Sequence, residues 1–359
     1  MTAASPRVNI LVLNYNRWRD TVECLESVFR ITYPTWRVVV CDNASTDGSL
    51  DRIRDWADGR LTHTLPAENP LRALSEPPVP KPIRFVGYDN VRAEAGGRSD
   101  DVDAPLTLIN VGSNRGFTGG NNVGLRYLLA NRGDELANEY VCLLNNDAVI
   151  APSCIGHMVD LAERDAAIGA VGGTMFEYSA PNVVQVAGGG WVSLWHGGTR
   201  ANGVGASRAE PPDRALGFVS GCCMLVRLST VARVGLLDER YFMYGDDTDW
   251  CVRMRAHGYR MGYAREAEIW HRGAGTAVRG GWTSDYHNVR SPLLFVWKFR
   301  PLRMPAAFAY SVYRCVLPKV VRGQWKRLRA VGRAYADVLG SALRQQHLKN
   351  GASPRALRS

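Results

Sequence analysis

The sequence predicts an α/β fold in which a mostly parallel central sheet is flanked by helices. Two features of the first 150 residues support this. Short apolar runs alternate with segments of helical periodicity, and polar residues follow the apolar runs directly. Such alternation buries a sheet on both faces. The expected strands are residues 8–13, 36–41, 106–110 and 140–144, and the expected helices are residues 21–29, 47–56 and 119–129.

Two stretches interrupt this alternation. Residues 60–105 contain a proline-rich part and a part rich in Gly and Asp, so we expect a surface insertion with one strand at residues 83–86. Residues 188–205 are rich in glycine and punctuated by aromatic residues. We expect them to form a loop that covers the site.

The C-terminal region, residues 291–359, is predicted to be a basic helical extension. Between residues 298 and 358, fourteen Lys or Arg stand against the single acid Asp337, in a chain of net charge +10. Residues 324–344 have the pattern of an amphipathic helix. No apolar run reaches the roughly 18 residues of a membrane span, and no signal peptide is recognisable.

Cysteine usage and the basic tail together predict a location. Eight cysteines without a C-x-x-C motif indicate reduced, buried thiols in a cytoplasmic chain. Aromatic residues beside cations in the tail are typical of an interfacial segment, so we expect peripheral attachment to the inner face of the membrane. The alternative is that these helices only pack on the rest of the chain or at a contact within a homo-oligomer.

Polar side chains follow three of the expected strands. In a parallel sheet, ligands bind beyond the carboxyl ends of the strands, so we expect these side chains to share one ligand-binding site. In chain order they are Asn14, Tyr15, Asn16, Asp42, Asn43, Asn145, Asn146 and Asp147.

Asp147 is the candidate metal ligand in this set. A diphosphate is usually neutralised by a hard divalent cation on carboxylate oxygen, and one carboxylate with open positions suits Mg²⁺ or Mn²⁺. A plain strand-end turn is the alternative reading of residues 145–147. His271 is of interest as a further ligand of that ion, although a packed histidine is the commoner case.

Two segments are candidates for contact with a nucleotide. Asp42 can accept the N3–H of uracil or thymine, while the residues after it also fit helix capping. Residues 114–122 form a glycine-rich lead into a helix whose backbone N–H groups can face a phosphate. The candidates there are Asn114, Arg115, Gly119 and Asn122.

An acidic cluster opens a later helix. Asp246, Asp247 and Asp249 fall within four positions, where the helix dipole offsets part of their repulsion. One of them can act as a general base toward an acceptor hydroxyl, and Arg253 can pair with Asp249. An acidic helix start without further role is the alternative. Trp270, beside His271, is counted with Asp246, Asp249 and Arg253 as an acceptor-side or supporting residue.

Together these motifs resemble the family-2 glycosyltransferases, especially their rhamnosyltransferase-like members. The shared order runs VLNYN, VVVCDNASTDGS, NRGFTGGNN, LLNNDA, GDDTDWCVR and IWH, over about residues 8–290. The resemblance implies a GT-A fold in residues 1–290, with a nucleotide-binding half (1–150) and an acceptor half (151–290), and inversion at the anomeric carbon.

The resemblance also assigns roles to single residues. Asp42 corresponds to the reader of the nucleobase, Asp147 to the last acid of the D-x-D motif, Asp247 to the base of the E-D-x-D motif, and His271 to a late metal-contacting histidine. This sequence departs from the family pattern in three ways. Asn145 replaces the first acid of D-x-D, Asp246 replaces a Glu, and the 60–105 insertion is long.

The sequence therefore predicts an inverting hexosyltransferase that uses a dTDP- or UDP-sugar, best dTDP-rhamnose, and a glycan or lipid-linked acceptor. A sugar-nucleotide pyrophosphorylase is the first alternative, but Asn14-Tyr15-Asn16 stands where its basic triphosphate loop would be. A nucleic-acid-binding protein is the second, suggested by the pI of 9.3. No stacking platform accompanies the basic residues, so we expect no nucleic-acid partner. An inactive binder is disfavoured because Asp147 and Asp247 are both present.

Overall fold

The computed structural model describes residues 5–98, 103–130, 133–208, 215–273 and 281–351, which divide into two units. The larger unit is built from Met1–Trp191, Arg200–Phe242 and Asp246–Gly275. The smaller one, here called the helical unit, is built from Val192–Thr199, Met243–Gly245 and Thr276–Ser359.

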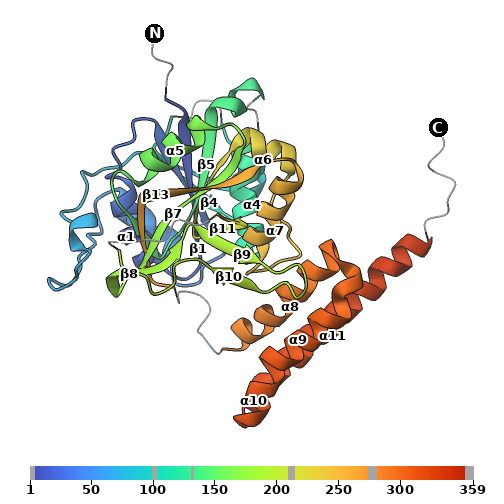
Figure 1. Cartoon of the computed structure of the whole chain (residues 1–359). Helices are drawn as coiled ribbons and strands as arrows, with labels where there is room; N and C mark the ends of the chain where they lie inside the picture. Colours follow the sequence, from blue (N-terminus) through green and yellow to red (C-terminus); the bar gives the residue numbers. More distant parts are fainter. Residues whose placement is uncertain (1–4, 99–102, 131–132, 209–214, 274–280, 352–359) are drawn as a thin grey trace, which may run out of the picture. The chain divides into compact units, whose positions relative to one another are not determined.

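A mixed ten-stranded sheet forms the centre of the larger unit as described (Figure 1). Its parallel part carries the strands expected from the sequence, which confirms the predicted α/β class. The remaining strands add antiparallel pairs. The order is β3 (Phe85–Asp89), β4 (Leu106–Asn110), β2 (Trp36–Asp42), β1 (Arg7–Asn14), β5 (Glu139–Asn145), β12 (Cys223–Arg227), β7 (Ile168–Glu177), β13 (Arg260–His271) and β6 (Ala148–Ile150), with β8 (Ala180–Ala187) on β7.

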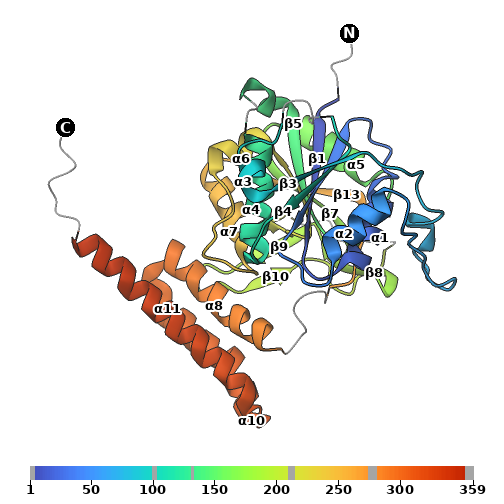
Figure 2. The ribbon, with the colours of Figure 1, turned by 180° about the vertical axis from the view of Figure 1, so that it is seen from behind.

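Helices cover both faces of the sheet because its central strands are apolar on both sides (Figure 2). Ile10 and Val12 of β1 pack in a core with α1 (Trp18–Val28), α2 (Ser49–Ala57) and α5 (Cys154–Arg164). Leu11 points the other way, into a core with α4 (Gly116–Leu129), α6 (Leu228–Val234) and α7 (Asp246–Ala256). All eight cysteines are free thiols, and seven of them are buried.

The insertion at residues 60–105 is anchored to α1 through a buried carboxylate. Glu26 accepts hydrogen bonds from the Lys81 ammonium at 2.9 Å, from the Val79 N–H at 2.8 Å and from the Trp56 indole at 2.8 Å. These bonds offset the cost of burying the charge. The insertion also holds η1 (Arg72–Leu74) and α3 (Asn90–Glu94), and its strand β3 begins and ends later than the expected 83–86 and forms a sheet edge.

Residues 188–205, expected to be a loop, contain two strands instead. β9 (Gly189–Val192) lies between β10 (Thr199–Ala201) and β11 (Phe218–Val219) in a separate three-stranded sheet. A Cβ on Gly189 would overlap the Phe218 carbonyl, and one on Gly190 would overlap the Arg200 carbonyl. The glycines therefore permit close strand approach, which composition alone does not distinguish from a loop.

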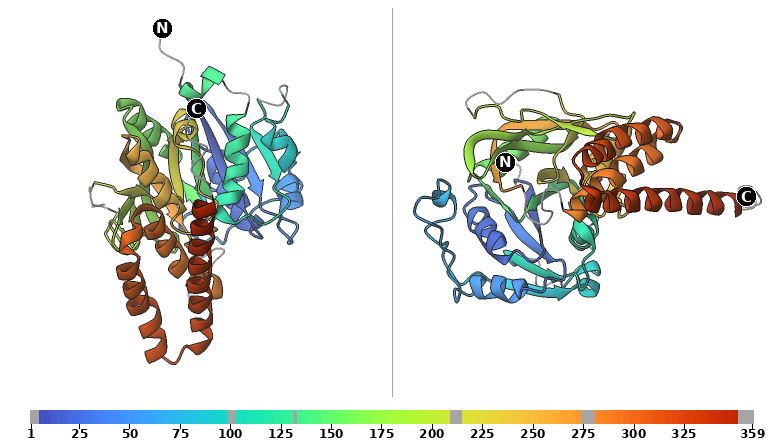
Figure 3. Two further views of the ribbon diagram at one scale, coloured as in Figure 1. Left: turned by 90° about the vertical axis from the view of Figure 1, so that its right-hand side faces the viewer. Right: turned by 90° about the horizontal axis from the view of Figure 1, so that it is seen from below.

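The helical unit confirms the expected C-terminal helices. It comprises α8 (Trp282–Phe299), η4 (Pro301–Arg303), α9 (Met304–Ser311), η5 (Val312–Val316), α10 (Leu317–Val321) and α11 (Trp325–Gly351), with α11 running beside α8 (Figure 3). Asp285 of α8 ties them together, since it accepts from Arg327 at 2.6 and 2.7 Å and pairs with Lys319 at 3.2 Å. Among the described residues, no helix is both long and apolar enough to cross a membrane. Residues 352–358 of the basic tail lie outside the described chain.

Candidate active site

The carboxyl ends of β1, β2 and β5 meet, as the parallel register requires. Asn14 pairs with Asp42 across β1 and β2, and Leu13 pairs with Asn145 across β1 and β5. The Asn14 amide donates to Asp42 Oδ1 at 2.6 Å and accepts from the Thr21 hydroxyl at 2.8 Å. Thr21 in turn accepts from the Asn146 amide at 2.9 Å. A single network thus joins three of the predicted strand-end positions.

Asp42 is held as a hydrogen-bond acceptor. Ser45 donates to it twice, from its N–H at 3.0 Å and from its hydroxyl at 2.7 Å. With the Asn14 bond, these contacts occupy both lone pairs of Oδ1 and one of Oδ2. One lone pair of Oδ2 is left to accept a further N–H, the group that uracil and thymine present.

A second loop is fixed beside Asp42. The Asn43 amide donates to Asn114 Oδ1 at 3.0 Å, and its oxygen accepts from the Arg115 N–H at 3.0 Å. This brings the predicted residues 114 and 115 next to the end of β2. Gly116 starts α4 with φ of 69°. A side chain at Gly116 would collide with the Phe242 carbonyl.

Four other predicted donor residues have different surroundings. Asn16, with φ of 54°, accepts from the Thr46 N–H at 2.6 Å and shapes the turn after β2. Tyr15 is half-buried beside it. Gly119 lies close to the side chain of Arg115, which a Cβ at Gly119 would meet at 2.6 Å. Asn122 bonds the Leu237 carbonyl and N–H at 2.9 and 3.1 Å, a contact that anchors α4 to the following loop.

Asp147 and His271 lie side by side although 124 positions separate them in sequence. Antiparallel pairing sets His271 opposite Ala148, and its Nε2 lies 3.1 Å from Asp147 Oδ1. Burial would raise the pKa of Asp147, but the hydrogen bond and charge of His271 outweigh it and lower that pKa. Asn145 completes the edge, with its amide nitrogen 3.3 Å from Nε2.

The hydrogen bonds around His271 fit a cation at this edge. Its Nδ1 lies 2.8 Å from Gln185 Oε1, and the Gln185 amide nitrogen donates to Glu177 Oε2 at 3.0 Å. Because a carboxylate only accepts, Glu177 fixes the Gln185 oxygen toward the ring. A neutral ring has one N–H, which Gln185 takes, so the Nε2 lone pair faces the Asp147 carboxylate. Either a proton or a metal ion between them satisfies both groups.

The protein provides only part of such a coordination shell. Among the described residues, no group of three or more His, Cys, Asp and Glu side chains is placed to hold a metal ion. Asp147 and His271 therefore fit Mg²⁺ or Mn²⁺ only as an ion shared with the oxygens of a bound diphosphate and water, which is common for Mg²⁺.

We expect Gln185→Met to weaken Mn²⁺ binding in the presence of dTDP by about 10- to 100-fold, because groups that orient a metal-bound histidine contribute this much to affinity. Electron paramagnetic resonance titration of free Mn²⁺ measures it. Gln185→Glu keeps an acceptor for Nδ1–H, so a smaller loss is expected. Unchanged Mn²⁺ affinity in Gln185→Met would show that Gln185 does not orient His271.

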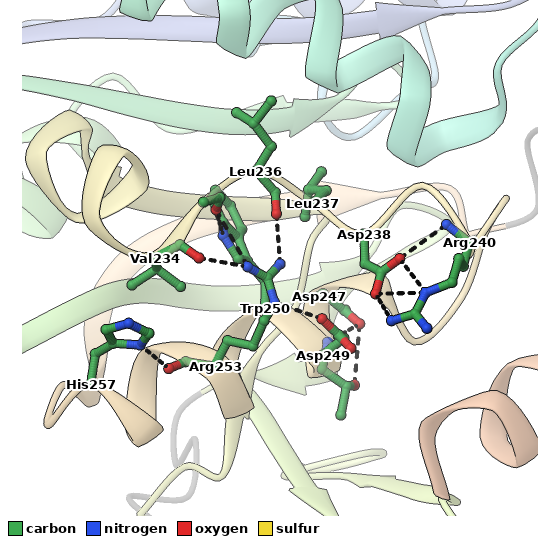
Figure 4. Close-up of polar contacts among 12 residues, drawn as sticks. Val234, Leu236, Leu237, Asp238, Arg240, Asp247, Asp249, Trp250, Arg253 and His257 are labelled. Carbon is green, nitrogen blue, oxygen red and sulfur yellow. Dashed lines mark hydrogen bonds and ion pairs between the residues drawn. The ribbon is translucent and has the colours of Figure 1, made fainter. Parts of the chain in front are cut away.

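The three acids at the start of α7 have different environments, and Figure 4 shows two of them, Asp247 and Asp249. Asp249 is fully buried and pairs with Arg253 at 2.8 Å. Arg253 also donates to the carbonyls of Val234 and Leu236 at 2.9 and 2.6 Å, so this pair fixes α7 to the end of α6. Asp246 is buried, with 3 % of its surface exposed. Asp247 alone of the three is partly accessible.

Asp247 is oriented by backbone donors. Its Oδ2 accepts from the Gly221 N–H at 3.1 Å, and its Oδ1 accepts from the Thr248 N–H at 2.7 Å. Burial raises its pKa above the ordinary aspartate value, although these donors oppose the shift. The pKa of Asp246 is raised further, by burial and then by the charge of Asp247. Asp247 therefore combines access, orientation and raised basicity.

Trp270 lies in the core of the larger unit. It is 4 % exposed, stacks on Phe176 at 5.7 Å and donates its indole N–H to the Pro181 carbonyl at 3.2 Å. Of the two roles expected for Trp270, acceptor-side or supporting, this position suits a supporting residue beside His271, which stays a prediction.

The sequence reasoning missed Gln185, Thr21, Ser45 and Gly221. Thr21 lies in the expected helix at residues 21–29 and Ser45 follows the end of β2 by three residues, so both hydroxyls lie within segments already identified. Gln185 lies in the strand β8 without a local motif, and Gly221 contributes only its N–H. Neither of these two has a sequence signal.

Comparison with known proteins agrees with this arrangement. Residues 91–282 match the family described as glycosyltransferase like family 2, and residues 9–69 match glycosyl transferase family 2. An N-acetylglucosaminyl-diphospho-decaprenol L-rhamnosyltransferase of Mycobacterium tuberculosis is 26% identical over 247 residues, which cover 63% of this chain and 80% of that protein. The low-salt glycan biosynthesis hexosyltransferase of Haloferax volcanii is 27% identical over 174 residues, covering 46% and 52%.

Solved structures show the same fold at low identity. A mannosyltransferase of Pyrobaculum calidifontis with GDP-Man and Mn²⁺ superposes with a TM-score of 0.50 at 17% identity, over 95% of this chain and 87% of that one. GalNAc-T7 with UDP, GalNAc and Mn²⁺ gives 0.54 at 10% identity, over 84% and 52%. None of the matches reported above is a pyrophosphorylase or a nucleic-acid-binding protein. Since the first family match spans more than half of the chain, the protein belongs to glycosyltransferase family 2 and is a hexosyltransferase with the GT-A fold.

Proposed function

We propose that this enzyme transfers rhamnose from dTDP-rhamnose to a hydroxyl of a lipid-linked glycan. The carrying observation is the edge of the sheet where Asp42 and the Asp147–His271 pair lie at the ends of β2 and β5, joined by the Asn14–Thr21–Asn146 network. In this arrangement a hydrogen-bond acceptor for the nucleobase lies at the end of β2, and a carboxylate and a histidine suited to a diphosphate-bound ion lie at the end of β5. The name of the mycobacterial relative supports rhamnose and a lipid-linked acceptor.

In this proposal different residues contact the nucleobase, the rest of the nucleotide and the diphosphate. Asp42 accepts the thymine N3–H through the lone pair left on Oδ2. The loop at Asn114 and Arg115 faces the nucleotide from beside Asn43. Asp147 and His271 would hold Mg²⁺ or Mn²⁺, which when bound neutralises charge on the departing diphosphate.

Asp247 acts as the base. It takes the proton of the acceptor hydroxyl while that oxygen forms a bond to C1 of the sugar. The bond from C1 to the diphosphate oxygen breaks, and dTDP leaves with the electron pair. Attack opposite the leaving group inverts the anomeric carbon. A raised pKa makes Asp247 a stronger base than an ordinary aspartate.

The pH dependence of kcat/KM is expected to reflect this shift. Below its pKa, Asp247 is protonated and accepts no proton, so activity falls as pH falls through that value. Because the pKa is raised, the fall should be centred above the ordinary aspartate pKa of 3.8. Initial rates across the acid range at saturating Mn²⁺ measure it. A profile still flat at 3.8 would contradict Asp247 as the base.

The nucleobase assignment predicts that Asp42→Asn weakens dTDP binding by roughly 10-fold or more, since a hydrogen bond to a charged group contributes about 1.5–3 kcal/mol. A screen of dTDP, UDP and GDP by thermal shift, with and without Mn²⁺, measures it, because a ligand specific to the native state raises the melting temperature. Asp51→Asn, at an exposed acid of α2, is the control. Stronger stabilisation by GDP than by dTDP and UDP would refute the assignment.

A further inference from the structure

One end of the helical unit exposes large apolar side chains. They surround the turn from α10 into α11 and are called here the apolar tip: Leu317, Val320, Val321 and Trp325. Val321 is 85% exposed and Trp325 is 64% exposed. Figures 1 and 3 show α10 and the first turn of α11 at this end of the unit. Such a cluster normally lies against something apolar.

The turn that presents the apolar tip is closed by backbone hydrogen bonds. α10 ends at Val321, and Gly323 after it has a φ of 62°, in the left-handed region. Its N–H bonds the Val320 carbonyl at 3.0 Å, and the Gln324 N–H bonds the Lys319 carbonyl at 2.8 Å. This is the usual way to end a helix at glycine. The exposure of Val321 and Trp325 thus follows from a defined turn.

The cations near the apolar tip divide into two sets. Lys319 and Arg327 are committed to Asp285 inside the unit. Arg322, Lys326 and Arg329 are exposed, and none of them pairs with an acid among the described residues. Residues 286–336 contain no Asp or Glu at all. Exposed cations without an acidic partner among the described residues therefore lie next to Val321 and Trp325 in the chain.

We propose that the apolar tip docks into an anionic lipid surface, with Val321 and Trp325 in the interface and Arg322 and Lys326 on the headgroups. Apolar side chains among cations are the composition of interfacial segments. A second copy of the chain fits less well, because a symmetric contact would bring two positive tips together. The proposal does not depend on the donor or on sugar transfer. A negative result for vesicle binding therefore leaves the proposed function untouched, and a negative result for donor binding leaves this proposal untouched.

Vesicle flotation with the full chain tests this. Phosphatidylglycerol–phosphatidylcholine vesicles are compared with phosphatidylcholine alone, at low and high salt. We expect binding to the anionic vesicles that weakens with salt. Arg322→Gln with Lys326→Gln should weaken it roughly 30-fold, from about 1 kcal/mol per cation. Val321→Ser with Trp325→Ser should weaken it about 10-fold or more. Circular dichroism verifies that both variants fold.

Matched controls lie in the insertion of the larger unit. Arg84→Gln with Arg92→Gln removes the same charge from exposed positions, and Val91→Ser removes an apolar side chain that is 75% exposed. Both should bind vesicles like the wild type. Three results would overturn the proposal: a wild type that stays off anionic vesicles at low salt, tip variants that bind no worse than the controls, or a wild-type dimer that the tip substitutions turn into monomers without any vesicle binding.

Discussion

Asp247→Asn is expected to lower kcat by about 100- to 10,000-fold while leaving the affinity for dTDP nearly unchanged, because a positioned base contributes this much to rate. The amide preserves the size of the side chain and can still accept from the N–H groups of Gly221 and Thr248. Only the ability to take a proton is lost. Release of dTDP in the presence of acceptor, measured under saturating donor, gives kcat.

Asp246→Asn is the matched control. Asp246 is buried, with 3 % of its surface exposed, and its pKa is raised well above the ordinary aspartate value by burial and then by the charge of Asp247. A buried carboxyl that an acceptor hydroxyl does not reach takes no proton from it, so Asp246→Asn should change kcat by less than about 10-fold. If Asp247→Asn keeps near-normal turnover, or if Asp246→Asn is the slower variant, the base has been assigned to the wrong residue.

Asp147→Ala is expected to abolish the strengthening of dTDP binding by Mn²⁺. Removal of a direct ligand should cost more than the 10- to 100-fold typical of residues that only orient one, so we expect at least about 100-fold in Mn²⁺ affinity. Calorimetric titration of dTDP in Mn²⁺ and in EDTA measures how much the ion strengthens dTDP binding. Titration of Mn²⁺ in the presence of dTDP measures the Mn²⁺ affinity. His271→Ala should have a smaller effect, because it removes a neutral ligand and leaves the carboxylate.

Asn145 offers a substitution in the opposite direction. Its amide lies beside His271 Nε2, in the position where the family pattern has an acid. Asn145→Asp adds a carboxylate to this edge and should therefore strengthen Mn²⁺ binding. Combining it with Asp160→Asn, at an exposed acid of α5, keeps the net charge of the chain unchanged, and the stronger Mn²⁺ binding should persist. If the wild type binds dTDP with equal affinity with and without the ion, the proposed metal site at Asp147 and His271 is contradicted.

The strand-end part of the site was predictable because it depends on local pattern and one topological rule. Apolar runs ending in Asn14, Asp42 and Asn145 mark parallel strands, and parallel strands end at a common edge. The pairing of His271 with Asp147 rests on the antiparallel contact of β13 with the short strand β6. No local periodicity indicates that contact, so His271 was identified only as a possible further ligand for an ion at Asp147 and through the family resemblance.

Other features depend on tertiary contacts that the sequence does not reveal. The acids of α7 look equivalent in sequence, and they differ only because Arg253 reaches the carbonyls of residues 234–236 while Gly221 faces Asp247. Gln185 acquires its role from the neighbouring Glu177 and His271. The contact of Trp270 with Phe176 depends on the pairing of β13 with β7, which the sequence does not reveal.

Nucleotide release during turnover tests the central claim most directly. Wild-type enzyme with Mn²⁺ and a polyprenyl-diphosphate-linked N-acetylglucosamine acceptor is given equal concentrations of dTDP-rhamnose, a UDP-hexose and GDP-mannose, and the nucleoside diphosphates formed are separated by chromatography. We predict acceptor-dependent release of dTDP first, because in the proposed site Asp42 has a lone pair left for the thymine N3–H and the mycobacterial relative is a rhamnosyltransferase. Preferential release of GDP, or no acceptor-dependent release of dTDP or UDP, would contradict it.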